Sequence, residues 1–262
     1  MLYYATPNAK LAHHLFDTID EADSNSLPCC PEIPILAMSK PLALIVGVGD
    51  GLSASLARLL FKEGYSIALA ARDTGKLTDL ARETDASCYA CDATKVNDVQ
   101  KLFASLESPP RVAIYNPSRI VRGPIEQVDP EQVKAALDVT AYGSFLVGQQ
   151  AAAAMLKEGQ GTILFTGASA GVKAFPRSAA FAMGKFAQRG LAESMARELH
   201  SQNIHVAWIN IDGGIHNPRR TETNPDSMLH PDEIAKMYLT LINQHRSVWS
   251  NEVAIRPWVE KF

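Results

Sequence analysis

The chain has 262 residues, of which 47% are hydrophobic and 20% are charged, a composition that can bury a sizeable core and is unlike that of a disordered protein. Its 25 Lys and Arg residues nearly balance 28 Asp and Glu residues, so the net charge of −3 favours neither nucleic acid nor an anionic membrane as a partner. No stretch approaches the roughly 18 consecutive apolar residues of a transmembrane helix. The 4 cysteines are too few for a disulfide-stabilised fold. These features predict a soluble, cytoplasmic globular protein of the size of an enzyme. A small molecule is the expected partner, on the motifs described below.

Residues 1–39 differ from the rest of the chain. The segment is polar in its middle, has no strong hydrophobic period, and lacks the basic and apolar regions of a secretory signal. We expect an N-terminal extension here, either disordered or an artefact of the start site, with Met38 as the alternative start. Residues 40–262 are expected to form a single domain.

From residue 42 onward, short apolar runs alternate with segments of helical period. The apolar runs predict buried strands at 43–46, 67–70, 88–91, 112–115, 162–166, 204–211 and 252–255. The helical segments between them are 52–63, 76–83, 96–106, 131–158, 179–199 and 231–243. Strands and helices that alternate in this way form parallel strands joined by right-handed crossovers. The predicted fold is therefore α/β, a doubly wound parallel sheet of the Rossmann type.

The first predicted strand runs directly into a glycine-rich turn. In doubly wound sheets the ligand lies beyond the carboxyl ends of the strands. Glycines at this point let a pyrophosphate approach the backbone N–H groups at the start of the next helix. The turn therefore predicts a nucleotide site formed by Gly47, Gly49, Asp50, Gly51 and Leu52.

The ends of the second and third strands indicate which nucleotide binds. An acid at the end of the second strand would bind the ribose 2′-hydroxyl of NAD, whereas an arginine suits the 2′-phosphate of NADP. Ala71 occupies that position and Arg72 follows it, which favours NADP(H) over NAD(H), although Asp73 weakens the preference. Asp92 and Ala93 follow the third strand and are expected near the adenine, with helix capping as the alternative role of Asp92.

Cys88 and Cys91 form a C-x-x-C pattern, which elsewhere indicates redox or zinc chemistry. Here the two residues lie in a predicted strand, where positions i and i+3 point to opposite faces. We therefore expect neither a disulfide nor a metal site from this pair.

These residues together resemble the short-chain dehydrogenase/reductase family over residues 41–262. The family motif T-G-x-x-x-G-x-G is matched at Gly47 and Gly51, with Ser53 in place of the third glycine. The resemblance implies the fold above and an oxidoreductase activity. It also implies that the two long helices form a homodimer or homotetramer. The further cofactor contacts that it implies are Asn116, Lys185, Gly213 and Ile215.

The catalytic pattern of the family is mostly absent. Its Tyr-x-x-x-Lys aligns with Phe181 and Lys185, its serine with Ala168, and its active-site asparagine with Thr140. Only Lys185 is retained. The combination resembles a divergent subgroup with Phe in place of the catalytic Tyr.

Phenylalanine has no exchangeable proton, so Phe181 cannot protonate a substrate oxygen. The candidate replacements are Lys185, acting directly or through a water, Ser169 on the adjoining loop, and His216, whose imidazole suits proton transfer at neutral pH. Two functions stay open. One is an NADP(H)-dependent oxidoreductase with an atypical site for a carbonyl or alcohol. The other is a catalytically inactive nucleotide-binding module that acts as a cofactor sensor or assembly subunit.

Overall fold

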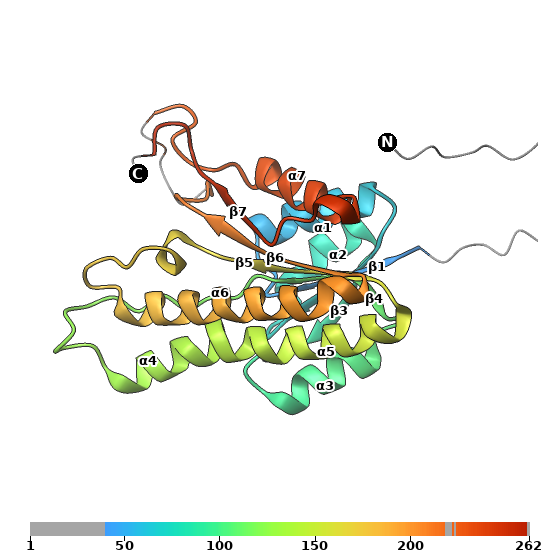
Figure 1. The fold of residues 1–262 in the computed structure, drawn as a ribbon, viewed down its shortest axis with the longest axis horizontal. Helices are drawn as coiled ribbons and strands as arrows, with labels where there is room; N and C mark the ends of the chain where they lie inside the picture. Colours follow the sequence, from blue (N-terminus) through green and yellow to red (C-terminus); the bar gives the residue numbers. More distant parts are fainter. Residues whose placement is uncertain (1–39, 218–221, 223, 261–262) are drawn as a thin grey trace, which may run out of the picture. The chain divides into compact units, whose positions relative to one another are not determined.

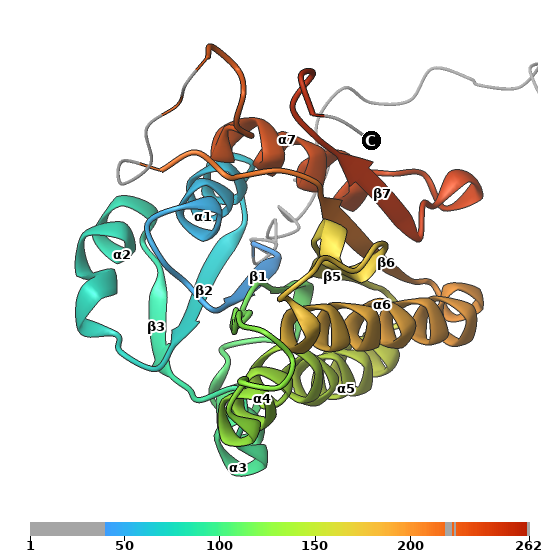
Figure 2. The same cartoon turned by 90° about the vertical axis from the view of Figure 1, so that its left-hand side faces the viewer.

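The sheet contains seven strands in the order β3-β2-β1-β4-β5-β6-β7, and all neighbouring pairs are parallel (Figure 2). The computed structural model describes residues 40–217, 222 and 224–260, so the predicted extension of residues 1–39 lies outside the described residues. The strands are β1 (Leu42–Val46), β2 (Ser66–Ala71), β3 (Ser87–Ala90), β4 (Pro110–Tyr115), β5 (Gly161–Thr166), β6 (Ile204–Ile211) and β7 (Glu252–Ile255). The helices are α1 (Leu52–Lys62), α2 (Thr78–Thr84), α3 (Val96–Ser105), α4 (Pro130–Leu137), α5 (Gly143–Glu158), α6 (Ala179–Leu199) and α7 (Pro231–Ile242).

Helices cover both faces of the sheet, as Figures 1 and 2 show. Helices α1, α2 and α7 pack on one face, and α3, α5 and α6 pack on the other, each with its own hydrophobic cluster. Strands that are covered on both sides are apolar along their whole length, which explains why β1, β5 and β6 are buried at every position. The prediction of a doubly wound, Rossmann-type parallel sheet is confirmed. No described helix has the length and apolar character needed to cross a membrane.

The predicted long helix 131–158 is interrupted by a π-helical turn at Asp138–Tyr142, between α4 and α5. The Tyr115 hydroxyl donates to the backbone oxygen of Val139, and a Cβ at position 143 would lie 2.3 Å from that hydroxyl. The wide turn therefore accommodates the tip of Tyr115, and Gly143 leaves the space for it. The hydrophobic period of residues 131–158 could not predict this interruption, because Tyr115 comes from a different element.

Smaller differences concern element ends and the cysteine pair. The helix predicted from residue 76 begins at Thr78, because a 3-10 turn at Gly75–Leu77 precedes it. Helix α6 begins at Ala179 as predicted, and Arg177 before it has a φ of +62°, which a helix does not accept. Strand β3 ends at Ala90, and the structure leaves Cys88 exposed and Cys91 buried as free thiols. The opposite orientation expected of the pair is confirmed. The described residues contain no group of three or more His, Cys, Asp or Glu side chains that could hold a metal ion.

Candidate functional site

A continuous groove runs along the carboxyl edge of the sheet, and three connected cavities form it. The glycine-turn cavity, of about 940 Å³, contains Gly47, Gly49, Asp50, Gly51 and Leu52. The Lys185 cavity measures about 510 Å³, and the Arg72 cavity measures about 410 Å³. Residues shared between neighbouring cavities connect them, namely Asn116, Ile215 and Asn217 for the first and second, Gly47 for the first and third, and Ser118 for the second and third.

The glycine turn has the geometry that a pyrophosphate requires. Gly47 has a φ of +84°, and a Cβ there would lie 2.4 Å from the Pro117 side chain, so only glycine fits. A Cβ added at Gly49 or Gly51 would meet no atom within 4 Å, which leaves the backbone open to a ligand. Helix α1 has no side-chain cap at Gly51 and no acidic residue in its first turn. Its N–H groups and positive dipole end therefore remain available to an anion.

Ser53 stands where the family motif has its third glycine, and its hydroxyl connects two parts of the groove. Its Oγ donates to the backbone oxygen of Gly47 at 3.1 Å and accepts a hydrogen bond from Nδ2 of Asn116. The serine therefore ties the glycine turn to the loop after β4. The departure from the motif adds hydrogen bonds and leaves the space for a cofactor open.

The Arg72 cavity collects positive charge at the end of β2. Arg72 and Lys76 both line it, and the acid position at Ala71 is empty as predicted. The Asp73 carboxylate accepts a hydrogen bond from the backbone N–H of Gly75 at 3.0 Å, so a local turn engages it. Lys76 was not predicted as a site residue. A second cation four positions after Arg72 could have indicated it, since both follow the same strand.

Asp92 and Ala93 line the same cavity, on the side of β3. The Asp92 carboxylate accepts hydrogen bonds from the N–H and hydroxyl of Thr94, at 3.0 and 2.8 Å. Burial raises the pKa of Asp92, but the two hydrogen bonds together with the charges of Lys95 and Arg72 hold the pKa below its ordinary value. The alternative that Asp92 caps α3 is wrong, because Lys95 occupies the N-cap position and Asp92 closes the preceding turn.

The Lys185 cavity brings together most of the predicted catalytic positions. Lys185, Ser169, Phe181 and Ala168 all line it, as does Gly213, a predicted cofactor contact. Thr140 does not line it and is 1% exposed. Its side chain accepts a hydrogen bond from the backbone N–H of Arg119 at 3.2 Å, so it supports the loop after β4.

His216 lies apart from this group. It lines the glycine-turn cavity, and its ring stacks on that of His230 with centroids 5.2 Å apart. The structure therefore brings Lys185 and Ser169 together and places His216 opposite the glycine turn.

Lys185 is 2% exposed, and its ammonium is held by two acceptors. Its Nζ donates to the backbone oxygen of Thr166 at 2.6 Å and to Oε1 of Gln188 at 3.1 Å. Burial lowers the pKa of Lys185 to about 7. A lysine in this state can give or take a proton at neutral pH, which an exposed lysine cannot do.

Comparison with known proteins agrees with this geometry. A family profile described as short chain dehydrogenase matches residues 41–227. An uncharacterised oxidoreductase of Staphylococcus aureus (strain MRSA252) is 24% identical over 233 residues, which cover 84% of this chain and 98% of the relative. A short-chain dehydrogenase from Rhodopseudomonas palustris superposes with a TM-score of 0.73 at 31% identity, over 83% of this chain and 99% of the other. A metagenomic short-chain oxidoreductase in complex with NADP superposes with a TM-score of 0.72 at 25% identity, over 84% of this chain and 98% of the other.

The fold and the site define a nucleotide-binding protein of the short-chain oxidoreductase class. The chain belongs to the short chain dehydrogenase family.

Proposed function

We propose that this protein is an NADP(H)-dependent oxidoreductase with an atypical active site, which interconverts a carbonyl and an alcohol on a small molecule. The observation that carries the proposal is the pair of cations at the end of β2, where Arg72 and Lys76 line a cavity whose acid position is empty. A 2′-phosphate is a dianion that such a pair binds, whereas a ribose diol gains little from it. The similar metagenomic oxidoreductase was solved with NADP, which supports the same cofactor here.

In this proposal, different residues of the groove bind different parts of the cofactor. The glycine turn would hold the pyrophosphate, Arg72 and Lys76 the 2′-phosphate, and Asp92 with Ala93 the adenine end. At the other end, the nicotinamide half would lie against four groove residues, Asn116, Lys185, Gly213 and Ile215. When bound, the dinucleotide supplies or accepts the hydride.

The chain itself must supply the proton. In this proposal Lys185 donates a proton from Nζ to the substrate oxygen, directly or through a water, because Phe181 has none to give. Ser169, on the same cavity wall, donates a hydrogen bond to that oxygen. We prefer Lys185 to His216 because His216 faces the glycine turn.

Replacing Arg72 tests the choice of cofactor. In Arg72→Ala the Kd for NADPH is expected to rise about 10- to 100-fold, the equivalent of one charged hydrogen-bonded contact, while the Kd for NADH stays the same. Lys76→Ala is expected to act in the same direction and less strongly, because an ammonium binds phosphate at a single point. Calorimetric or fluorescence titration measures the Kd of each variant and of the intact protein for NADPH and for NADH.

Arg82→Ala is the matched control for these variants, since Arg82 is exposed on α2 and pairs with Asp79, a neighbour one turn away. It should change neither constant. Equal weakening of NADPH and NADH in Arg72→Ala would contradict the preference for NADP(H). Failure of the intact protein to bind either dinucleotide would contradict the proposed function as a whole.

We also propose that the protein forms a homodimer or homotetramer through α5 and α6, which lie side by side in Figures 1 and 2. Phe145 and Phe186 are 42% and 43% exposed on these helices, and Tyr142 stacks on Phe145. Exposed aromatic side chains of this kind are typical of an interface. Changing both Phe145 and Phe186 to Asp should produce monomers in light scattering. An unchanged mass for this variant would place the interface elsewhere.

A cytoplasmic location is part of the same proposal. The two cysteines of the described residues, Cys88 and Cys91, are free thiols, which suits a reducing compartment.

A further inference from the structure

Behind the Lys185 ammonium lies a buried polar cluster that the family pattern does not explain. Gln188, one helical turn after Lys185 on α6, is 0% exposed, and Trp208 on β6 is 1% exposed. A buried carboxamide costs free energy unless its hydrogen bonds are satisfied, and an apolar side chain would fill the same place without that cost. The presence of a glutamine here therefore calls for a reason beyond packing.

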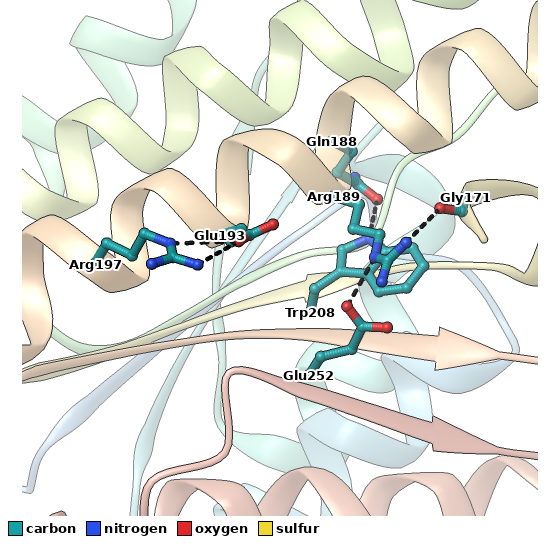
Figure 3. A network of polar contacts seen from close by, with 7 residues as sticks. All are labelled: Gly171, Gln188, Arg189, Glu193, Arg197, Trp208 and Glu252. Atoms are coloured by element: carbon teal, nitrogen blue, oxygen red, sulfur yellow. Dashed lines mark hydrogen bonds and ion pairs between the residues drawn. The ribbon is translucent and has the colours of Figure 1, made fainter.

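The hydrogen bonds of Gln188 fix the orientation of its amide. Oε1 accepts from Nζ of Lys185 at 3.1 Å and from Nε1 of Trp208 at 3.3 Å, and the second of these bonds is drawn in Figure 3. Nε2 donates to the backbone oxygen of Thr140 at 3.4 Å. Turning the amide over would place its NH₂ group against two donors, so only this orientation satisfies all three partners.

Trp208 is in turn held by the loop after β5 and by Arg189. A Cβ at Gly167 or Gly171 would lie 2.3 or 2.7 Å from the indole, so the loop that carries Ala168 and Ser169 packs directly against it. The Arg189 guanidinium lies 5.7 Å from the ring, donates to the backbone oxygen of Gly171 at 3.4 Å and pairs with Glu252 at 2.7 Å, and Figure 3 draws both polar contacts. The indole N–H therefore gives Gln188 a fixed reference point.

The two acceptors of Lys185 determine where the rest of the ammonium points. A tetrahedral nitrogen bonded to Cε and hydrogen-bonded to the Thr166 oxygen and Gln188 Oε1 has one direction left. In the protonated form that direction carries the third N–H, and in the neutral form it carries the lone pair. Since Lys185 lines the cavity with Phe181 and Ala168, this direction is available to a substrate or cofactor hydroxyl.

We propose that Gln188 is a positioning residue that, braced by Trp208 and the Thr140 backbone, holds Lys185 so that one N–H bond or lone pair addresses the cavity. The inference rests on the proposed function only for the use that catalysis makes of Lys185. The positioning itself is a property of these residues.

Besides Gln188, the groups that could affect the pKa of Lys185 are the titratable and charged side chains on the elements around it. On the α7 side, Tyr238 bonds the Thr166 hydroxyl at 2.7 Å and so lies behind β5. Three charged residues, Arg122, Asp212 and Glu260, line the same cavity, and Asp212 pairs with Arg256 at 3.3 Å. Burial lowers the pKa of Lys185, while the hydrogen bonds from its ammonium to the Thr166 oxygen and to Gln188 Oε1 stabilise the charged form.

Two substitutions at Gln188 are expected to shift the pKa of Lys185 in opposite directions. Gln188→Met keeps the length of the side chain but removes the acceptor, so the pKa of Lys185 falls below that of the intact protein. Gln188→Glu keeps the acceptor and adds a negative charge, so the pKa rises by about one unit or more. Titration of ¹³Cε-labelled lysine by NMR, with the signal identified by its loss in Lys185→Met, measures both shifts directly.

The pH profile supplies a second readout, because the alkaline limb of kcat/KM should move with the pKa of Lys185 in each variant. Gln100→Glu, on an exposed position of α3, is the control for added charge and should shift neither quantity.

An unchanged pKa in folded Gln188→Met overturns the inference, whatever happens to the Glu variant. If the pKa moves in both variants while the limb of the profile does not follow, Gln188 does position Lys185, and the proposed role of Lys185 as the proton donor is wrong.

Discussion

Phe181→Tyr combined with Ala168→Ser is expected to raise turnover about tenfold or more with NADPH and a reactive carbonyl compound. A positioned general acid contributes roughly 10²–10⁴-fold, of which the Lys185 ammonium already supplies a part in the intact protein, so the two new hydroxyl groups add only the remainder. Both residues line the Lys185 cavity, so the new phenol and hydroxyl face the same space as the Lys185 ammonium. Steady-state oxidation of NADPH at matched saturation measures the gain.

The control for this variant uses a second phenylalanine of the same cavity. Phe175 is 42% exposed and also lines it, so Phe175→Tyr adds the same hydroxyl at a different place and should bring no gain. A double variant that is folded and binds NADPH as the intact protein does, but turns over no faster, would mean that the missing acid does not limit the reaction.

The second large effect concerns Lys185 and pH. If the Lys185 ammonium donates the proton, the reactive form is the protonated one, which prevails below its pKa of about 7. For carbonyl reduction, kcat/KM should therefore be level at acidic pH and fall about tenfold per pH unit above 7. Lys185→Met should lower kcat/KM by about 10²-fold or more and abolish this limb.

Two checks separate this effect from weaker cofactor binding, since Lys185 is also expected to contact the cofactor. The Kd for NADPH is measured for each variant, and Lys62→Met, a change of an exposed lysine in the last turn of α1, serves as the control. A rate that rises with pH through 7 would show that the neutral amine is needed and would exclude the ammonium as the donor.

Most of the fold, and the residues that line the groove at the carboxyl edge of the sheet, could be predicted because local patterns encode them. The apolar runs identify the strands. Because ligands of such sheets lie beyond the carboxyl ends of the strands, Gly47, Gly51 and Arg72 are then expected at the same edge of the sheet, where the structure places them. The twelve predicted cofactor residues all line the groove, although they come from separate loops. A parallel sheet leaves few alternatives once the strand order is known.

The interior of the catalytic region could not be predicted in this way. Gln188 is a polar residue in the middle of a helical pattern, and only the fold brings it against Trp208 and the Thr140 backbone. The position of His216 depends in the same way on long-range contacts. Its N–H bonds the backbone oxygen of Leu229 at 2.9 Å, which fixes the segment after β6 beside the glycine turn.

The four positions predicted to depart from the family pattern have different surroundings in the structure. Ser53 joins Gly47 to Asn116, and Thr140 holds the loop after β4. Ala168 and Phe181 line the Lys185 cavity without bringing a hydroxyl group to it, and Lys185 is the buried cation of that cavity.

The transfer of deuterium from NADPH to a product tests the central claim most directly. The protein is incubated with NADPH that carries deuterium at either face of C4 and with a panel of aldehydes and ketones, and mass spectrometry follows the alcohols. We predict that one of the two labelled forms transfers deuterium to at least one alcohol, and that Lys185→Met slows the transfer. Tight binding of NADPH without labelled alcohol from any compound would contradict the account and identify a nucleotide-binding module that has lost its chemistry.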